Sequence, residues 1–129
     1  MASRGAKSKN GHITTKEYTT VHISDSGVKI LKGIGANHSL PDYAHTPNSI
    51  YAKVRDDGSL HSMRFYDSEG WPIIEIAYHP ERDLDPSGKR IVHYHTYHNL
   101  TRDDADYLTK EMKEKYSKYL KEFDLYDKC

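Results

Sequence analysis

The fold is decided by residues 50–80, which read IYAKVRDDGSLHSMRFYDSEGWPIIEIAYHP. Two turn signals divide this stretch, an Asp-Gly pair at Asp57 and Gly58 and the run Asp67-Ser68-Glu69-Gly70. Both compositions favour tight hairpin turns, because Gly adopts positive φ at little cost and Asp hydrogen-bonds to nearby backbone. The stretch therefore predicts three antiparallel strands joined by two short turns.

The two turns also predict which residues lie opposite each other. The expected pairs are Lys53 with Ser62, Tyr51 with Arg64, Arg64 with Ile73, and Ser62 with Glu75. Because side chains alternate along a strand, the stretch has two faces. The predicted core face is apolar apart from His61 and holds Ile50, Ala52, Val54, Met63, Phe65, Ile74, Ile76 and Tyr78. The predicted polar face holds Tyr51, Lys53, Arg55, Ser62, Arg64, Tyr66, Ile73, Glu75 and His79.

A fourth strand is expected over Ile91–His98, after a loop from His79 to Lys89 that contains two prolines and a glycine. Its parity is open in the sequence. We place Val92, Tyr94 and Thr96 on the core face, because the reverse parity would bury two histidines. His93, His95 and Tyr97 then lie on the polar face.

The remaining segments complete the predicted fold class, which is α+β. Thr101 reads as the N-cap of a long helix to Asp127, since acidic residues follow it and an apolar stripe recurs every three or four residues. This helix is expected to cover one face of a four-stranded antiparallel meander. Residues 1–11 read as a disordered basic tail, and residues 12–129 as one domain whose N-terminal region is irregular or partly extended.

Composition excludes several classes of function. Lys plus Arg and Asp plus Glu both number 19, so net charge gives no case for nucleic-acid or membrane binding. No apolar run is long enough for a membrane span, so no membrane partner is expected. Cys129 is the single cysteine and cannot form an internal disulfide, which favours a reducing cytoplasm.

The motif His93-Tyr94-His95 puts two imidazoles on one side of a strand, about 6.7 Å apart at Cα given a rise of about 3.3 Å per residue. This spacing suits an acid and base pair, with Arg64 or Lys53 supplying a cation for a phosphate. It equally suits a metal site with a third ligand from His79, Glu75 or His98. A third interpretation is surface histidines without chemistry.

Glu75 has two interpretations, since it stands between isoleucines on its predicted strand. It could be a cross-strand partner for Lys53 or Arg64. It could equally orient a histidine or act as a base.

Residues 46–98 resemble a group of small domains encoded by phages and other mobile elements. The resemblance rests on the run from Thr46 to Tyr51, the run from Arg64 to Ile76 and the His-rich strand that follows. These domains are grouped with barnase, EndoU, colicin D and RelE among nuclease-like and polymorphic toxin domains. The resemblance implies an irregular or helical segment before a four-stranded antiparallel sheet, with metal-independent cleavage of RNA.

The resemblance assigns residues to this chemistry and implies partners. His93 and His95 would be acid and base, Glu75 would orient one histidine, and Arg64 would bind the phosphate. Beyond the residues that the resemblance matches, we expect Lys53, Tyr66 and Tyr97 of the polar face to bind substrate, and we expect no cofactor.

RNA is the partner that this reading implies. One alternative is a non-catalytic phage interaction protein, either a host-defence inhibitor or a morphogenesis accessory. Its partner would be a host or phage protein, such as an immunity protein or a target. The other is a metal-binding domain that uses His93, His95 and His79.

Overall fold

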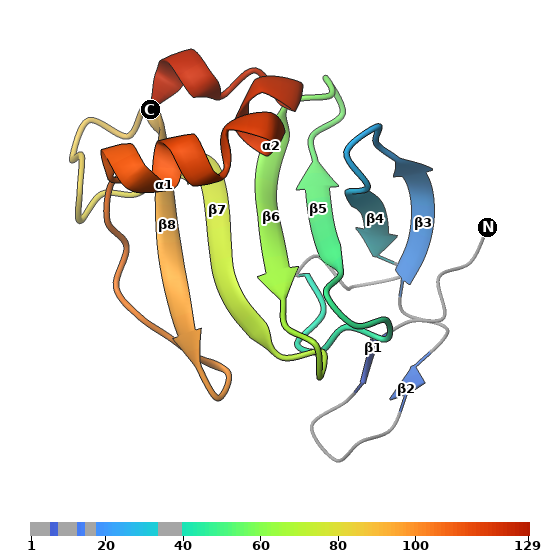
Figure 1. The fold of residues 1–129 in the computed structure, drawn as a ribbon. Helices are drawn as coiled ribbons and strands as arrows, with labels where there is room; N and C mark the ends of the chain where they lie inside the picture. The colour runs from blue at the N-terminus through green and yellow to red at the C-terminus, as the bar shows by residue number, and fades with distance from the viewer. Residues whose placement is uncertain (1–5, 8–12, 15–17, 34–39) are drawn as a thin grey trace.

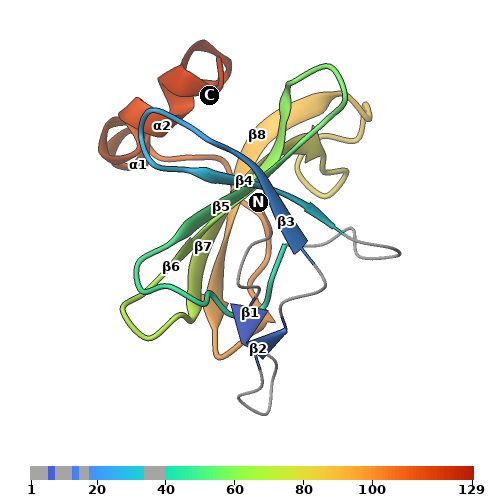
Figure 2. The same ribbon diagram turned by 90° about the vertical axis from the view of Figure 1, so that its right-hand side faces the viewer.

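The computed structural model describes residues 6–7, 13–14, 18–33 and 40–129, and its main feature is a twisted sheet (Figures 1 and 2). Within these residues the sheet has seven strands in the order β3-β4-β5-β6-β7-β8-β9. The strands are β3 (Tyr18–Ile23), β4 (Lys29–Gly33), β5 (Ile50–Val54), β6 (Leu60–Tyr66), β7 (Pro72–Pro80), β8 (Arg90–His98) and β9 (Thr101–Arg102). A separate short ladder pairs β1 (Ala6–Lys7) with β2 (Ile13–Thr14).

The sheet is mixed and has more strands than predicted. The prediction that the sheet is a four-stranded antiparallel meander is therefore wrong. Strands β5 to β8 do form an antiparallel meander, but β3 and β4 extend it at one edge and β9 at the other. Strand β4 pairs in parallel with β5, through Lys29 opposite Tyr51 and Ile30 opposite Ala52. The N-terminal region was expected to be irregular or partly extended, and its residues 18–33 form a hairpin. A bond from Gly27 N to the Ser24 carbonyl closes the turn of this hairpin.

The single long C-terminal helix is also wrong. The chain instead forms two six-residue helices, α1 (Lys110–Lys115) and α2 (Ser117–Glu122), followed by a 3-10 turn, η1 (Tyr126–Lys128). Tyr116 lies between the two helices with φ −102° and ψ 14°, which interrupts the helical backbone. Figure 1 shows both helices crossing one end of the sheet in front of β6, β7 and β8.

The predicted start of the helix at Thr101 is too early in the chain, because Thr101 belongs to a strand. Thr101 and Arg102 pair with Tyr97 and His98 as strand β9. Asp106 then makes an isolated bridge with Tyr94, so the chain runs back along β8 before any helix forms. Thr109 is the actual N-cap, and its hydroxyl accepts a hydrogen bond from the Met112 N–H at 3.2 Å.

The apolar stripe was nevertheless correctly assigned to the core. Leu120 is fully buried in the main core cluster, which the apolar sheet face lines. Leu120 was not part of the predicted stripe. The members of the stripe pack against the same cluster while half-buried: Leu108, Met112, Tyr116, Tyr119, Phe123 and Tyr126.

Two β-bulges alter the expected pairing. Between β5 and β6 the pairs Lys53–Ser62 and Tyr51–Arg64 are confirmed, but the register shifts at Val54–Leu60. Between β6 and β7 the pairs Arg64–Ile73 and Ser62–Glu75 are wrong, because the turn is one residue longer than expected, with Tyr66 opposite Pro72, and a bulge at Ile73 adds a second residue of shift. Arg64 therefore lies opposite Glu75, and Ser62 opposite Ala77. A shift of two leaves each side chain on its expected face.

The parity chosen for β8 is confirmed. His95 lies opposite Glu75, and His93 lies opposite Ala77. Both histidines are nevertheless buried, with exposed fractions of 0% and 4%. The expectation that this parity would leave them on an open polar face is therefore wrong.

The polar face is buried because a second layer of chain covers part of it. Leu40 and Ala44 precede β5 and pack against Tyr51 and Tyr66, together with Tyr18 of β3 and Leu31 of β4. Apart from Ala6–Lys7, the tail predicted to be disordered lies outside the described residues. Residues 34–39 of the predicted loop lie outside them as well.

None of the helices in the described part of the chain is long and apolar enough to cross a membrane.

Candidate functional site

An ion pair between Arg64 and Glu75 lies on the buried polar face. Glu75 Oε1 accepts from Arg64 Nε at 3.1 Å and from Nη2 at 2.9 Å. Arg64 Nη1 donates to the carbonyls of Leu40 at 3.2 Å and Pro41 at 3.0 Å. All three guanidinium nitrogens therefore bind protein groups, and a phosphate would have to displace some of them.

The surroundings of Arg64 keep it charged. Burial alone would lower its pKa, but the interactions with Tyr66 and with the Glu75 carboxylate raise the pKa overall. The Tyr66 hydroxyl donates to the Pro41 carbonyl, and burial raises the Tyr66 pKa well above its usual value. The guanidinium also lies over the Tyr97 ring, 5.0 Å from its centroid. The expected substrate-binding residues Tyr66 and Tyr97 thus contact Arg64.

His93 and His95 are held by backbone carbonyls. His93 Nδ1 lies 3.0 Å from the Ile91 carbonyl oxygen, and His95 Nδ1 lies 2.8 Å from that of Asp103. A carbonyl oxygen can only accept, so each Nδ1 carries the proton and each Nε2 carries the lone pair in the neutral ring. Burial lowers the pKa of His93, which favours the neutral form.

The two Nε2 atoms have no partner. Each is buried, and no hydrogen-bonding group in the described part of the chain reaches either of them. Leaving a buried polar atom unsatisfied costs about 1–3 kcal/mol. Two such atoms on one side of one strand mark a place where a bound group could satisfy both.

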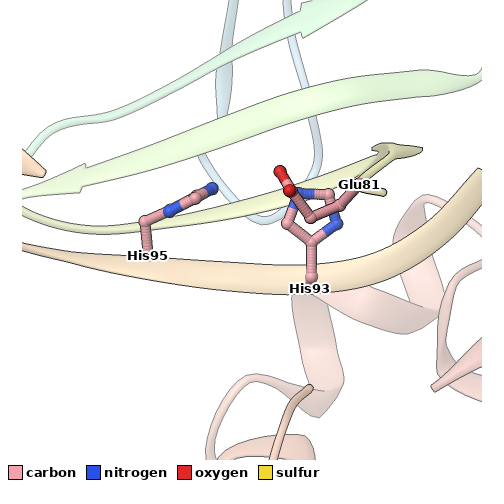
Figure 3. Close-up of side chains that lie close together, drawn as sticks. All are labelled: Glu81, His93 and His95. Atoms are coloured by element: carbon pink, nitrogen blue, oxygen red, sulfur yellow. The ribbon is translucent and has the colours of Figure 1, made fainter. Parts of the chain in front are cut away.

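Glu81 supplies a third group. A carboxylate oxygen of Glu81 and one ring nitrogen each of His93 and His95 lie within 4.8 Å of one another. Figure 3 shows both imidazoles rising from the same side of β8, with the Glu81 carboxylate extending over His93. Two imidazole nitrogens and a carboxylate form a donor set that suits zinc and related transition metals.

The sequence interpretation missed Glu81 because it ended the strand pattern at His79. Residues 75, 77, 79 and 81 share one parity, and β7 extends to Pro80. Extending the alternation by one residue past Pro80 puts Glu81 on the histidine side. The signal was therefore present, but Pro80 and the following turn residues favoured a loop.

The histidine expected as third ligand, His79, lies beside this group but not within it. Its ring packs edge-on against His93, with centroids 4.6 Å apart, and its Nδ1 bonds to the Pro80 carbonyl at 2.9 Å. His61 packs on the other side of His79 at 4.8 Å. The bulge after Lys53 accounts for this position, because His61 leaves the core face, where it was expected, and its Nδ1 lies 3.1 Å from Ser62 Oγ.

The structure thus brings together most of the residues expected in the site. Arg64, Glu75 and His95 are neighbours across three strands, and His93 lies one alternation further along β8. Lys53 is half-buried on β5, with the width of β6 and β7 between it and His93. His98 lies apart from the group and is exposed, pairing with Asp103 at 2.9 Å.

Comparison with known proteins finds no matching family model, no similar curated protein and no similar solved structure.

Proposed function

We propose that this chain binds a divalent transition metal ion, zinc or a metal of similar preference. The ligands are Nε2 of His93, Nε2 of His95 and the carboxylate of Glu81. The observation that carries the proposal is the pair of buried Nε2 atoms without a partner in the described residues, beside a carboxylate. One ion would satisfy both atoms at once.

The hydrogen bonds behind the ligands support the same proposal. Histidines that bind a metal usually donate the other ring N–H to a carbonyl or carboxylate, which fixes the tautomer and the ring orientation. His93 and His95 each do so, towards Ile91 and Asp103. Contraction of the group to bond lengths of about 2.0–2.2 Å for Zn²⁺ needs only side-chain adjustment, since the three donors already lie close together.

The test is zinc titration of metal-free protein purified without a histidine tag. One ion per chain is expected, in competition with a chromophoric chelator. The variants His93→Ala and His95→Ala should each weaken binding about a hundredfold or more, because each removes one of three ligands.

A matched control separates this site from incidental histidine binding. His22 is exposed on β3, away from the site, so His22→Ala should bind zinc as the unchanged chain does. The proposal fails if the unchanged chain binds no more tightly than His93→Ala, or if His22→Ala loses as much affinity.

A second candidate is metal-independent RNA cleavage with His93 and His95 as acid and base. One observation favours it: Glu75 lies directly opposite His95, where it could orient that ring. Incubation with pooled RNA and excess chelator tests it. Cleavage that His95→Ala abolishes would support this candidate, and no cleavage by the unchanged chain would end it.

We retain the reducing cytoplasm as the proposed location. The support is compositional, because Cys129 is the only cysteine of the chain.

A further inference from the structure

The proposed metal centre has fewer protein donors than zinc requires. Among the described residues, the only group of three or more metal-binding side chains within reach of one another is Glu81, His93 and His95. Structural zinc sites are closed by four protein ligands, whereas sites with three keep a position for an external ligand. Whether a fourth protein group can close this centre therefore decides its type.

The neighbours that could close it are engaged elsewhere. Glu75 accepts two hydrogen bonds from Arg64 within the buried ion pair. His79 is fixed at Nδ1 by the Pro80 carbonyl and packs edge-on against the His93 ring. His79 Nε2 is not held by this bond, but His79 is not one of the three donors that lie within 4.8 Å of one another, so its ring would have to turn from the edge-on contact to reach a metal held by His93.

Solvent can reach the centre from one side. His93 and His95 are buried, but Glu81 and the adjacent His79 are only half-buried. Glu81 also begins the connection between β7 and β8, which is largely exposed. An external ligand would therefore enter beside Glu81.

The charge of the centre selects the ligand. A divalent ion with one carboxylate and two neutral imidazoles keeps a net positive charge. Arg64 and Glu75 cancel each other nearby. Lys53 lies on the same face, and its positive charge acts on His61 together with the positive charge of Arg55 and the negative charge of Glu75. Positive charge in a partly buried site favours an anion.

We propose that the metal centre keeps an open coordination position, entered beside Glu81, which binds a small oxyanion such as a phosphate or a carboxylate. This inference rests on the proposed metal binding. It assigns the site to the open type, in which an external molecule exchanges on the metal.

Cobalt-substituted protein tests the inference, because the visible absorption of Co²⁺ reports its coordination. Inorganic phosphate and acetate are titrated separately into protein loaded with one Co²⁺. A saturable change of the absorption bands is expected with at least one of them, and comparing the two distinguishes phosphate from carboxylate as the preferred oxyanion. Bands that neither anion changes at high concentration would overturn the inference.

The variant His79→Ala distinguishes the open site from one closed by His79. If the position is open, His79→Ala keeps the cobalt affinity and the anion response of the unchanged chain. If His79 is a fourth ligand, the variant loses cobalt affinity as His93→Ala does, which overturns the inference while leaving metal binding intact. If the unchanged chain takes up no cobalt or zinc, the proposed function itself fails.

Discussion

Arg64 and Glu75 show how one buried pair can stabilise a polar sheet face. Arg64 is 9% exposed and Glu75 is 5% exposed, and the carbonyls of Leu40 and Pro41 accept the remaining guanidinium bonds. The pair thus ties the segment before β5 to strands β6 and β7. Its primary role in this geometry is to hold the second layer of chain over the sheet.

Replacing Arg64 by Ala should therefore lower the free energy of unfolding strongly. The change leaves Glu75 buried without its partner, and breaking a buried pair in this way costs about 3–5 kcal/mol. Urea denaturation measures the free energy of unfolding. Arg82→Ala is the control, since exposed Arg82 binds only the Pro86 carbonyl and its loss should cost about 0.5 kcal/mol or less. Equal stabilities of the two variants would contradict this role.

The buried histidines predict a stability that falls in mild acid. Burial, with the positive charges of His79 and Lys53, lowers the pKa of His61 from its usual value of 6.5 to about 4. Burial lowers the pKa of His93 as well. Between pH 6.5 and about 4 the unfolded chain therefore binds protons that the folded chain does not, so stability falls as the pH falls.

Urea denaturation of the metal-free protein at several pH values measures this dependence. His61→Gln should flatten the fall between pH 6.5 and 4, because it removes one of the groups responsible. His22→Gln should leave the fall unchanged. A free energy of unfolding that stays constant across this range, or rises towards acid, would contradict the prediction.

Single residues also show what sequence reasoning can reach. Alternation predicted that Arg64, Glu75, His93 and His95 share a face, because a period of two survives an error of two in register. It could not predict that this face is buried, since the covering residues are distant in sequence. Glu81 was missed because a proline and turn residues obscured the end of β7.

At the scale of elements, the turn between β6 and β7 depends on Gly70. Its φ is +87°, and a Cβ there would lie 2.5 Å from the Ala44 carbonyl oxygen, beside the bond from Ala44 N to Gly70 O. Gly58, in the turn between β5 and β6, has φ +86° with nothing within 4 Å of such a Cβ. Substitution of Gly58 therefore tests backbone strain alone, whereas substitution of Gly70 tests backbone strain together with a steric clash.

Gly58→Ala should cost about 1 kcal/mol, from the left-handed backbone alone. Gly70→Ala should cost clearly more, about 2–4 kcal/mol, because Ala44 must also move. Thermal or urea denaturation of the two variants side by side gives the difference. Equal losses would show that the segment around Ala44 does not pack closely on this turn.

The return from β8 to β9 positions His95. Asp103 holds its own place through its N–H to the Thr96 carbonyl at 2.9 Å and through its carboxylate, which accepts from Thr96 Oγ1. Its carbonyl then accepts from His95 Nδ1. Asp103 thus supports the His95 ring from behind, at Nδ1, and makes no hydrogen bond to Nε2 of His93 or His95.

Asp103→Ala should weaken zinc binding about tenfold, as expected when the partner behind a ligand is disturbed. Asp104→Ala is the matched control, because Asp104 is the exposed neighbour. Zinc competition measures affinity, and denaturation of the metal-free forms shows whether stability changes in parallel. Unchanged affinity in Asp103→Ala would contradict the positioning role.

The helical region shows why the longest element was misjudged. The stripe from Leu108 to Tyr126 was correctly assigned to the core, yet an apolar stripe does not fix where a helix begins or whether it continues. Thr101 and the acidic residues after it match a helix start locally. Pairing of β9 with β8 overrides that local preference, and Tyr116 divides the rest.

At the scale of the whole molecule, two cores lie on opposite faces of the sheet. The apolar cluster lies under α1 and α2, and the Tyr-rich cluster lies under residues 40–44 and the N-terminal strands. The parallel pairing of β4 with β5 could not be predicted from sequence, because no local turn connects the two strands. A metal would add a link between β8 and the connection that begins at Glu81.

The most direct measurement of this link is anomalous diffraction from crystals soaked with zinc. The predicted result is one peak at about 2.0–2.1 Å from Nε2 of both His93 and His95, with a Glu81 oxygen at a similar distance. A map without a peak between these three side chains, or with zinc bound only at other histidines, would contradict a metal centre in this protein.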